Sequence, residues 1–137
     1  MIGIVIVAHG GLAREYLAAM QHVVGELPGT AAVSIAPDDD RTAKTAEIDA
    51  AIEAVDTGDG VVVVTDIYGG TPSNLAAGAC ARPDRTMLYG ANVPLLIQLA
   101  KVRSLPLRDA VACALAAGRK YIDCVEGIEN RQRPVAI

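Results

Sequence analysis

The run Ile2-Gly3-Ile4-Val5-Ile6-Val7-Ala8, which leads directly into His9-Gly10-Gly11, decides the fold. It is apolar and rich in β-branched residues, without polar alternation, which is typical of a strand covered on both faces. Residues 61–65, four valines and a threonine, repeat this pattern and end at Asp66. Two such strands predict a mostly parallel sheet, because right-handed crossovers place the connecting helices on both of its faces.

Apolar segments and amphipathic patterns alternate along the rest of the chain. We expect further strands over residues 31–36, 85–89 and 121–125. Helical patterns cover residues 12–27, 41–55, 71–81, 92–102 and 107–117. Pro28-Gly29 and Gly118 are the expected ends of two of these helices. This alternation predicts a doubly wound α/β fold, and a flavodoxin-like arrangement would give its strands the order 2-1-3-4.

Composition limits the class of protein. The chain has 137 residues, of which 52% are hydrophobic and 20% charged, as expected for one globular domain. Its net charge of -4 and scattered basic residues argue against nucleic-acid binding. The longest wholly apolar run, residues 110–117, is far shorter than the roughly 20 residues that cross a bilayer.

The ends of the chain and its cysteines complete this picture. The N-terminus has no basic region before its apolar stretch and so differs from a signal peptide. We expect one domain over residues 1–129, a polar tail over 130–137, and a cytoplasmic location without membrane insertion. Three thiols without paired spacing fit reduced, buried residues: Cys80, Cys113 and Cys124.

Two residues whose side chains can take part in a reaction follow two of the predicted strands. His9 comes directly after the first strand and Asp66 directly after the third. If these strands are neighbours, both side chains emerge at one edge of the sheet, where an imidazole and a carboxylate can hydrogen-bond. The bond would leave the other ring nitrogen unprotonated and nucleophilic. In the alternative interpretation, His9 is an ordinary strand-end histidine and Asp66 a turn residue.

The residues around this pair favour an anion. Gly10-Gly11 and Gly69-Gly70 allow the backbone to approach a ligand closely. Thr71, followed by Pro72, is the expected N-cap of a helix whose free N–H groups and dipole attract negative charge. Together these features predict a pocket for a phosphoryl group held by backbone donors and the Thr71 hydroxyl. We expect no metal and no cofactor.

Other templates fail on particular residues. The chain lacks a GxSxG nucleophile elbow, a GxxxxGK[ST] phosphate loop and a GxGxxG motif after its first strand. Asp38-Asp39-Asp40 fits a solvated loop that begins the next helix better than a metal site. His22 lies off the apolar stripe of its helix and is expected on the surface. Asn92 and Val93 reach the same edge as His9, or simply start a helix together with Pro94.

Three segments together resemble a known family. They are residues 4–10 (IVIVAHG), 65–74 (TDIYGGTPSN) and 89–96 (YGANVPLL). Their combination resembles the IIA component of the mannose family of the bacterial phosphoenolpyruvate-dependent sugar phosphotransferase system. The resemblance extends from Met1 to about residue 125, in the same order and spacing.

The resemblance implies a role for each matching residue. His9 matches the histidine that receives a phosphoryl group from the phosphocarrier protein HPr. Asp66 matches the carboxylate that bonds this histidine, and Thr71 matches a small hydroxyl residue beside the phosphate. Further expected phosphate-binding residues are Gly10, Gly70, Pro72 and Ser73. Expected partner-docking residues are Tyr68, Asn92 and Val93, and the apolar Ile67 and Leu95 belong either to this docking patch or to the core.

The family also implies a homodimer that exchanges a C-terminal strand, here residues 121–125. This chain departs from the family pattern at Ser73, where many members have Phe, and at Tyr68, where others have Trp or Phe. Members of the family often carry a IIB domain after a linker, which we do not expect in this sequence, and the expected acceptor is a IIB component or a regulatory protein. Two alternatives stay open: the phosphoryl-donor subunit of a dihydroxyacetone kinase, and a non-catalytic regulatory module read by its phosphorylation state.

Overall fold

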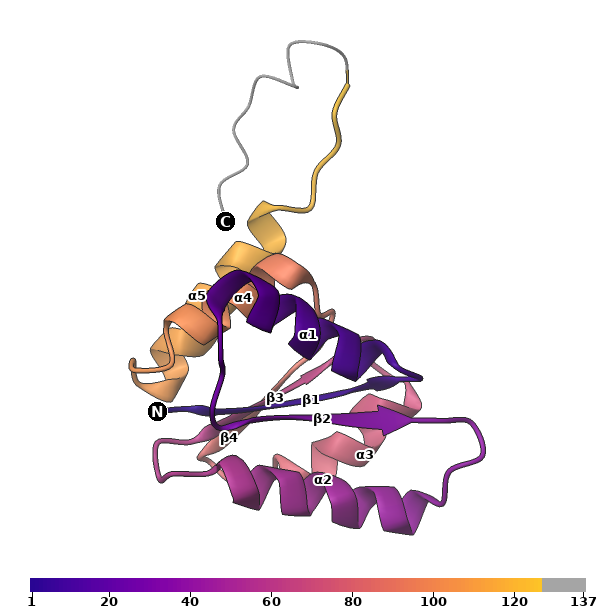
Figure 1. Cartoon of the computed structure of the whole chain (residues 1–137). Helices are drawn as coiled ribbons and strands as arrows, with labels where there is room; N and C mark the ends of the chain where they lie inside the picture. The colour runs from indigo at the N-terminus through magenta and orange to yellow at the C-terminus, as the bar shows by residue number, and fades with distance from the viewer. Residues whose placement is uncertain (127–137) are drawn as a thin grey trace.

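A four-stranded sheet lies between two layers of helices (Figure 1). The structure is a computed structural model and describes residues 1–126. The strands are β1 (Gly3–His9), β2 (Thr30–Ile35), β3 (Val61–Thr65) and β4 (Arg85–Leu88). The helices are α1 (Leu12–Val24), α2 (Arg41–Val55), α3 (Thr71–Ala79), α4 (Val93–Lys101) and α5 (Leu107–Lys120).

The sheet has the order β2-β1-β3-β4, and every pair of neighbouring strands is parallel. The predicted fold class and strand order are therefore confirmed. The order makes β1 and β3 neighbours, with Val7 opposite Thr65 in their register. Consequently the residues that follow these two strands meet at the same edge of the sheet.

Alternate residues of β1 build two separate apolar layers. Ile4 and Ile6 belong to the cluster that α1, α4 and α5 cover, whereas Val5 and Val7 belong to the cluster under α2 and α3 (Figure 1). All four side chains are fully buried, which explains the lack of polar alternation along this strand. Burial of each contributes roughly 1.5–3 kcal/mol relative to an exposed side chain.

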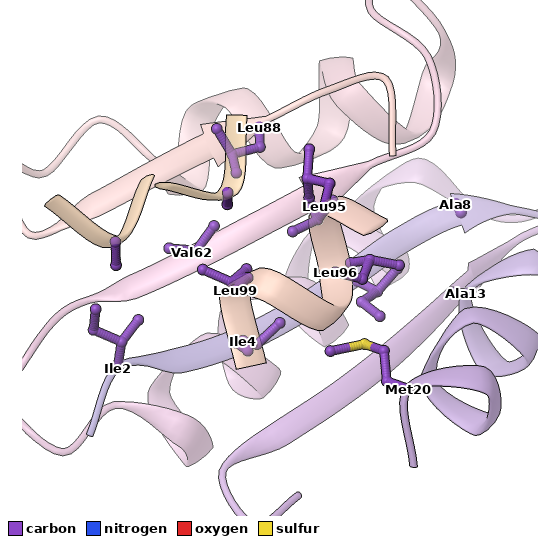
Figure 2. Packing of buried hydrophobic residues seen from close by; sticks show 14 residues of the cluster. Ile2, Ile4, Ala8, Ala13, Met20, Val62, Leu88, Leu95, Leu96 and Leu99 are labelled. Carbon is purple, nitrogen blue, oxygen red and sulfur yellow. The ribbon is translucent and has the colours of Figure 1, made fainter. Parts of the chain in front are cut away.

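The buried side chains of the first cluster are aliphatic apart from Met20, and the partly buried Tyr16 packs against them. Figure 2 shows Met20 of α1 together with Leu96 and Leu99 of α4, gathered around Ile4 and Val62 of the sheet. With no Phe or Trp in the sequence, these helices pack on the sheet through Leu, Ile, Val, Met and Ala.

Two helices end at places other than those expected. α1 ends at Val24, where Gly25 turns the chain with a φ of 87°, and not at Pro28-Gly29. α5 continues through Gly118 to Lys120. An added Cβ at Gly118 would lie 3.0 Å from Cβ of Leu95, so this glycine allows α5 to approach α4 closely instead of ending the helix.

The strand expected over residues 121–125 is not formed in this chain. Residues 122–126 have no regular secondary structure, and Ile122 and Val125 are exposed. In Figure 1 this segment leaves the body of the protein beyond α5, away from the edges of the sheet where it could find a neighbour to pair with. Exchange of the segment between two copies stays a prediction, and the predicted tail over residues 130–137 lies outside the described residues.

The cysteines are less buried than expected. Cys80 and Cys113 are partly buried, and Cys124 is exposed because it lies in the segment after α5. Burial raises the pKa of the Cys80 thiol to about 11. Within residues 1–126, no helix combines the length and the apolar character needed to span a bilayer.

Two glycine substitutions test the packing of the sheet. A Cβ at Gly3 would lie 2.5 Å from the carbonyl oxygen of Val55, so Gly3→Ala should lower the free energy of unfolding by about 1–3 kcal/mol. Gly78 of α3 has open space around it, and Gly78→Ala should raise this free energy by up to about 1 kcal/mol. Urea unfolding measures both values. Equal effects of the two substitutions would contradict the close contact between β1 and α2.

Candidate functional site

The candidate site lies at the edge where the parallel strands end. His9 is the last residue of β1, and Asp66 follows the last residue of β3. Nδ1 of His9 lies 2.8 Å from Oδ2 of Asp66, so the predicted contact between the two side chains is present. Residues separated by 57 positions meet here because β1 and β3 are adjacent.

The Asp66 carboxylate accepts hydrogen bonds through both of its oxygens. Oδ2 accepts from the His9 backbone amide at 3.0 Å as well as from the ring, and Oδ1 accepts from the backbone amide of Ile67 at 2.9 Å. Partial burial opposes the charged form, but the bonds from His9 and Ile67 outweigh it, so the pKa of Asp66 lies below its usual value. The carboxylate is therefore a fixed negative charge beside the ring.

This contact determines which nitrogen of His9 is available. Because the carboxylate accepts, Nδ1 carries the proton of the neutral ring and Nε2 keeps a lone pair. The side chain of His9 is 52% exposed, compared with 12% for Asp66. The arrangement holds one side of the imidazole and leaves the ring open to a reactant on the other.

Gly70 forms a wall of the site beside the imidazole. A Cβ at this position would lie 3.0 Å from Cε1 of His9 and 3.5 Å from Nε2. The former distance is shorter than the ~3.5–4.0 Å at which carbon atoms make favourable contact. The missing side chain of Gly70 is thus what lets the backbone before α3 approach the nucleophilic edge of the ring.

The helices next to His9 begin without side-chain caps. α1 and α3 start after Gly11 and Gly70, and neither N-cap residue makes a side-chain hydrogen bond. By contrast, Asp40 caps α2 by accepting from the Thr42 amide, as expected for the Asp38-Asp39-Asp40 loop, and Asn92 caps α4. Uncapped helix N-termini present free N–H groups and positive potential to an anion.

Thr71 is the first residue of α3, not its N-cap as the sequence predicted. The hydrogen bonds of residues 1–126 leave the backbone N–H groups of Thr71 and Ser73 without an acceptor, and Pro72 has no N–H. The first amide of the helix that is bonded is that of Asn74, which donates to the carbonyl of Gly70. The amide of the partly buried Thr71 is therefore available to a ligand, whereas Ser73 is only 2% exposed.

Two of the expected phosphate-binding residues use their polar groups elsewhere. The N–H of Gly10 donates to the carbonyl of Ile35 at 2.8 Å, which extends the pairing of β1 with β2. The hydroxyl of Ser73, a residue only 2% exposed, bonds the backbone of Gly69 and Gly70. The Gly10 amide and the Ser73 hydroxyl thus already have partners within the protein, and a phosphate-binding role for these two residues stays a prediction.

The expected docking residues divide into exposed and internal ones. Tyr68 and Ile67 are exposed, and the ring of Tyr68 lies 4.6 Å, between centroids, from that of the exposed Tyr89. Leu95 is 3% exposed and belongs to the core, and Val93 is partly buried. The amide of Asn92 is engaged internally, since its oxygen accepts from the Leu95 amide and its nitrogen donates to the Gly118 carbonyl.

Tyr16 of α1 is a residue near the site that the sequence analysis did not single out. In the structure its hydroxyl donates to the carbonyl of Ala91 at 3.2 Å and so ties α1 to the loop before α4. Burial and, next, the negative charge of Asp66 raise the pKa of Tyr16. The sequence held one signal for this hydrogen bond: Tyr16 is a phenol on an otherwise aliphatic helix face, and a buried hydroxyl requires an acceptor. His22, in turn, is exposed on α1 as expected.

A match to a family model shows the family to which the chain belongs. The model of the PTS system fructose IIA component matches residues 3–115, which include β1, β3 and both segments of the site. The chain belongs to this family. The resemblance inferred from three sequence segments is therefore confirmed, and a IIA component is a phosphotransferase protein.

Individual relatives agree with this family. The chain is 25% identical over 128 residues to the PTS system mannose-specific EIIAB component of Escherichia coli (strain K12), an alignment that includes 91% of this chain. The chain spans 40% of the length of that relative. It is 26% identical over 98 residues to the PTS system sorbose-specific EIIA component of Lacticaseibacillus casei, covering 71% of this chain and 70% of the relative.

Solved structures share the fold. The mannose/sorbose specific IIA subunit of the phosphotransferase system from Enterococcus faecalis superimposes with a TM-score of 0.82 at 26% identity, over 93% of this chain and 96% of that one. The phosphotransferase system component EIIA from Streptococcus agalactiae gives a TM-score of 0.77 at 22% identity, over 90% of this chain and 97% of that one.

The lowered pKa of Asp66 makes a contribution to stability that depends on pH. Its pKa in the folded protein lies below the ordinary value of 3.8, so the stabilisation is complete above that value and is lost as pH falls through the folded pKa. Asp66→Asn, which leaves one of three donors without a good acceptor, should cost about 1–3 kcal/mol at neutral pH. The difference from the wild type should shrink below pH 3.8. Urea unfolding across this pH range measures it, and a difference that stays constant in acid would contradict the assignment.

Proposed function

We propose that the chain is a phosphocarrier of the phosphotransferase system that accepts a phosphoryl group on Nε2 of His9. The proposed donor is phospho-HPr, and the acceptor is a IIB component or a regulatory protein. The observation that supports this most directly is the hydrogen bond between Nδ1 of His9 and Asp66, on a ring whose other side is open. A phosphohistidine intermediate makes the protein a relay that needs no cofactor.

The transfer step follows from the geometry of the ring. The lone pair of Nε2 forms a bond to phosphorus while the bond between phosphorus and the donor's ring nitrogen breaks, and the donor nitrogen keeps that electron pair. Nδ1 retains its proton, so the phosphorylated imidazole of His9 is positive. The Asp66 carboxylate at 2.8 Å stabilises this charge. Transfer to the acceptor reverses the same steps.

Backbone donors hold the oxygens of the phosphoryl group in this proposal. The free amide of the partly buried Thr71 lies at the start of α3, and the Thr71 hydroxyl adds a further donor. Residues 65–74 contain no Lys or Arg, so neutral dipoles replace cationic side chains there. Gly70 contributes because its missing side chain leaves room beside the His9 ring. Pro72 contributes because it lies in the first turn of α3 and favours the start of the helix there.

Partner binding would use the exposed side chains beside the site. Ile67, Tyr68 and Tyr89 are more than half exposed, and they follow β3 and β4, which end at the same edge of the sheet as β1. Their apolar surface suits a brief contact with a protein that presents its own histidine. We extend the proposal to a cytoplasmic homodimer in which residues 121–125 pair with a second copy. The family match gives no support to a dihydroxyacetone kinase subunit or a purely regulatory module.

Phosphorylation by purified components tests the proposal. Phosphoenolpyruvate, Enzyme I and HPr should label the wild-type chain with one phosphoryl group that is labile in acid and stable in base. His9→Ala should abolish the label, because the nucleophilic nitrogen is gone. His22→Ala is the matched control, since it removes the other histidine of the chain from an exposed position on α1. Labelling that survives His9→Ala would overturn the proposal.

Gly70→Ala tests the close approach of backbone and ring. The new methyl group would press on Cε1 of His9 and on Cγ2 of Ile67, each at 3.0 Å, and should turn the imidazole away from Asp66. Because a misplacement of about 1 Å can slow a transfer by 10²-fold, we expect labelling to be about 10–100 times slower. Gly78→Ala in the same helix has open space and should label at the wild-type rate. Equal rates for the two variants would exclude Gly70 as a wall of the site.

A further inference from the structure

We propose that Ser73 is a positioning residue for phosphoryl transfer to His9. Its buried hydroxyl holds the Gly69-Gly70 turn in the one position that supports the imidazole. The inference rests on the proposed function, since it concerns the same reaction. It also assigns Ser73 a role that differs from the phosphate contact expected from the sequence.

The hydroxyl of Ser73 uses its hydrogen-bonding groups on the turn that precedes its own helix. Oγ accepts from the Gly69 amide at 2.9 Å and donates to the Gly70 carbonyl at 3.0 Å. The Gly70 carbonyl also accepts from the Asn74 amide at 3.0 Å. The peptide group before Gly69 and the one after Gly70 are therefore both fastened to the first turn of α3 through one side chain.

This turn needs an external constraint because of its composition. Gly69 has a φ of 84°, and Gly70 has no side chain that could restrict it. A glycine pair loses more backbone entropy on ordering than other residues do, so it moves readily unless hydrogen bonds fix it. At 2% exposure Ser73 is protected from water, which would otherwise compete for these bonds.

The position of this turn determines the position of the reacting groups. Gly70 is the residue whose added Cβ would lie 3.0 Å from Cε1 of His9 and 3.5 Å from Nε2. It is also the N-cap of α3, so its conformation directs the free amide of Thr71. A shift of the turn would therefore move both Gly70, the wall beside the imidazole, and the free amide of Thr71.

Single-turnover labelling by phospho-HPr distinguishes a positioning role from the alternatives, with kcat the labelling rate at saturating donor and KM the donor concentration at half of that rate. Ser73→Ala removes both bonds and should lower kcat about tenfold while leaving the KM for phospho-HPr unchanged, because a partner cannot touch a buried hydroxyl. An unchanged kcat, or a higher KM with the same kcat, would overturn the inference. The second result would mean that Ser73 acts in partner docking.

Thr30→Val is the matched control for a loss of stability alone. The Thr30 hydroxyl also braces a turn, by donating to the Leu27 carbonyl at 2.6 Å, but it lies at the start of β2, at the opposite edge of the sheet. Thr30→Val should lower the thermal stability without changing kcat. If both variants lose stability and neither changes kcat, the Ser73 hydroxyl is structural only and the inference is wrong.

A measurement on the resting protein separates this inference from the proposed function. In the NMR spectrum of the unphosphorylated chain, the His9 ring signals should shift and broaden in Ser73→Ala and stay unchanged in Thr30→Val. Unchanged ring signals in Ser73→Ala would overturn the inference even if the wild type is phosphorylated. Failure of phospho-HPr to label the wild type would instead overturn the proposed function, and the ring signals would still decide whether Ser73 positions His9.

Discussion

The pairing of β1 with β3 is the constraint on which the site depends. It brings His9 next to Asp66, and the carboxylate then receives three hydrogen bonds, two from His9 and one from Ile67. Because one bond comes from a backbone amide of the strand itself, the carboxylate is fixed by the sheet as well as by the ring. The imidazole is thus oriented by the most buried part of the protein, although the imidazole itself is half exposed.

The fold and the central pair could be predicted from the sequence because their signals are local. β1 and β3 are apolar on both faces, and a strand of this kind is recognisable without knowledge of its neighbours. His9 and Asp66 follow these strands directly, so a single assumption about strand order placed them together. The same signals failed for residues 121–125, where an apolar pattern exists but no strand among residues 1–126 pairs with it.

The remaining features could not be predicted because they depend on competition between nearby donors and acceptors. Thr71 was the expected N-cap of α3, but the N-cap is Gly70, where a side chain would press on the His9 ring. Ser73 is a residue type that often binds phosphate, yet its hydroxyl is hydrogen-bonded to the backbone of Gly69 and Gly70. Glycine often ends a helix, but Gly118 lies within α5 and packs against Leu95 of α4. Sequence spacing alone does not reveal which of these contacts forms.

Because residues 65–74 contain no cationic side chain, the backbone of this segment must be held rigidly if it is to bind an anion. A lysine or arginine side chain can follow a phosphoryl group as it moves, whereas backbone dipoles act only in the direction in which the chain holds them. An anion site made of amides must therefore be fixed before the ligand arrives, and a turn built from two glycines cannot fix itself. A buried hydroxyl bonded to both glycines supplies that order without adding charge. Under the proposed function, this order allows the site to stabilise a phosphoryl group in transit and still release it, as a relay between two proteins requires.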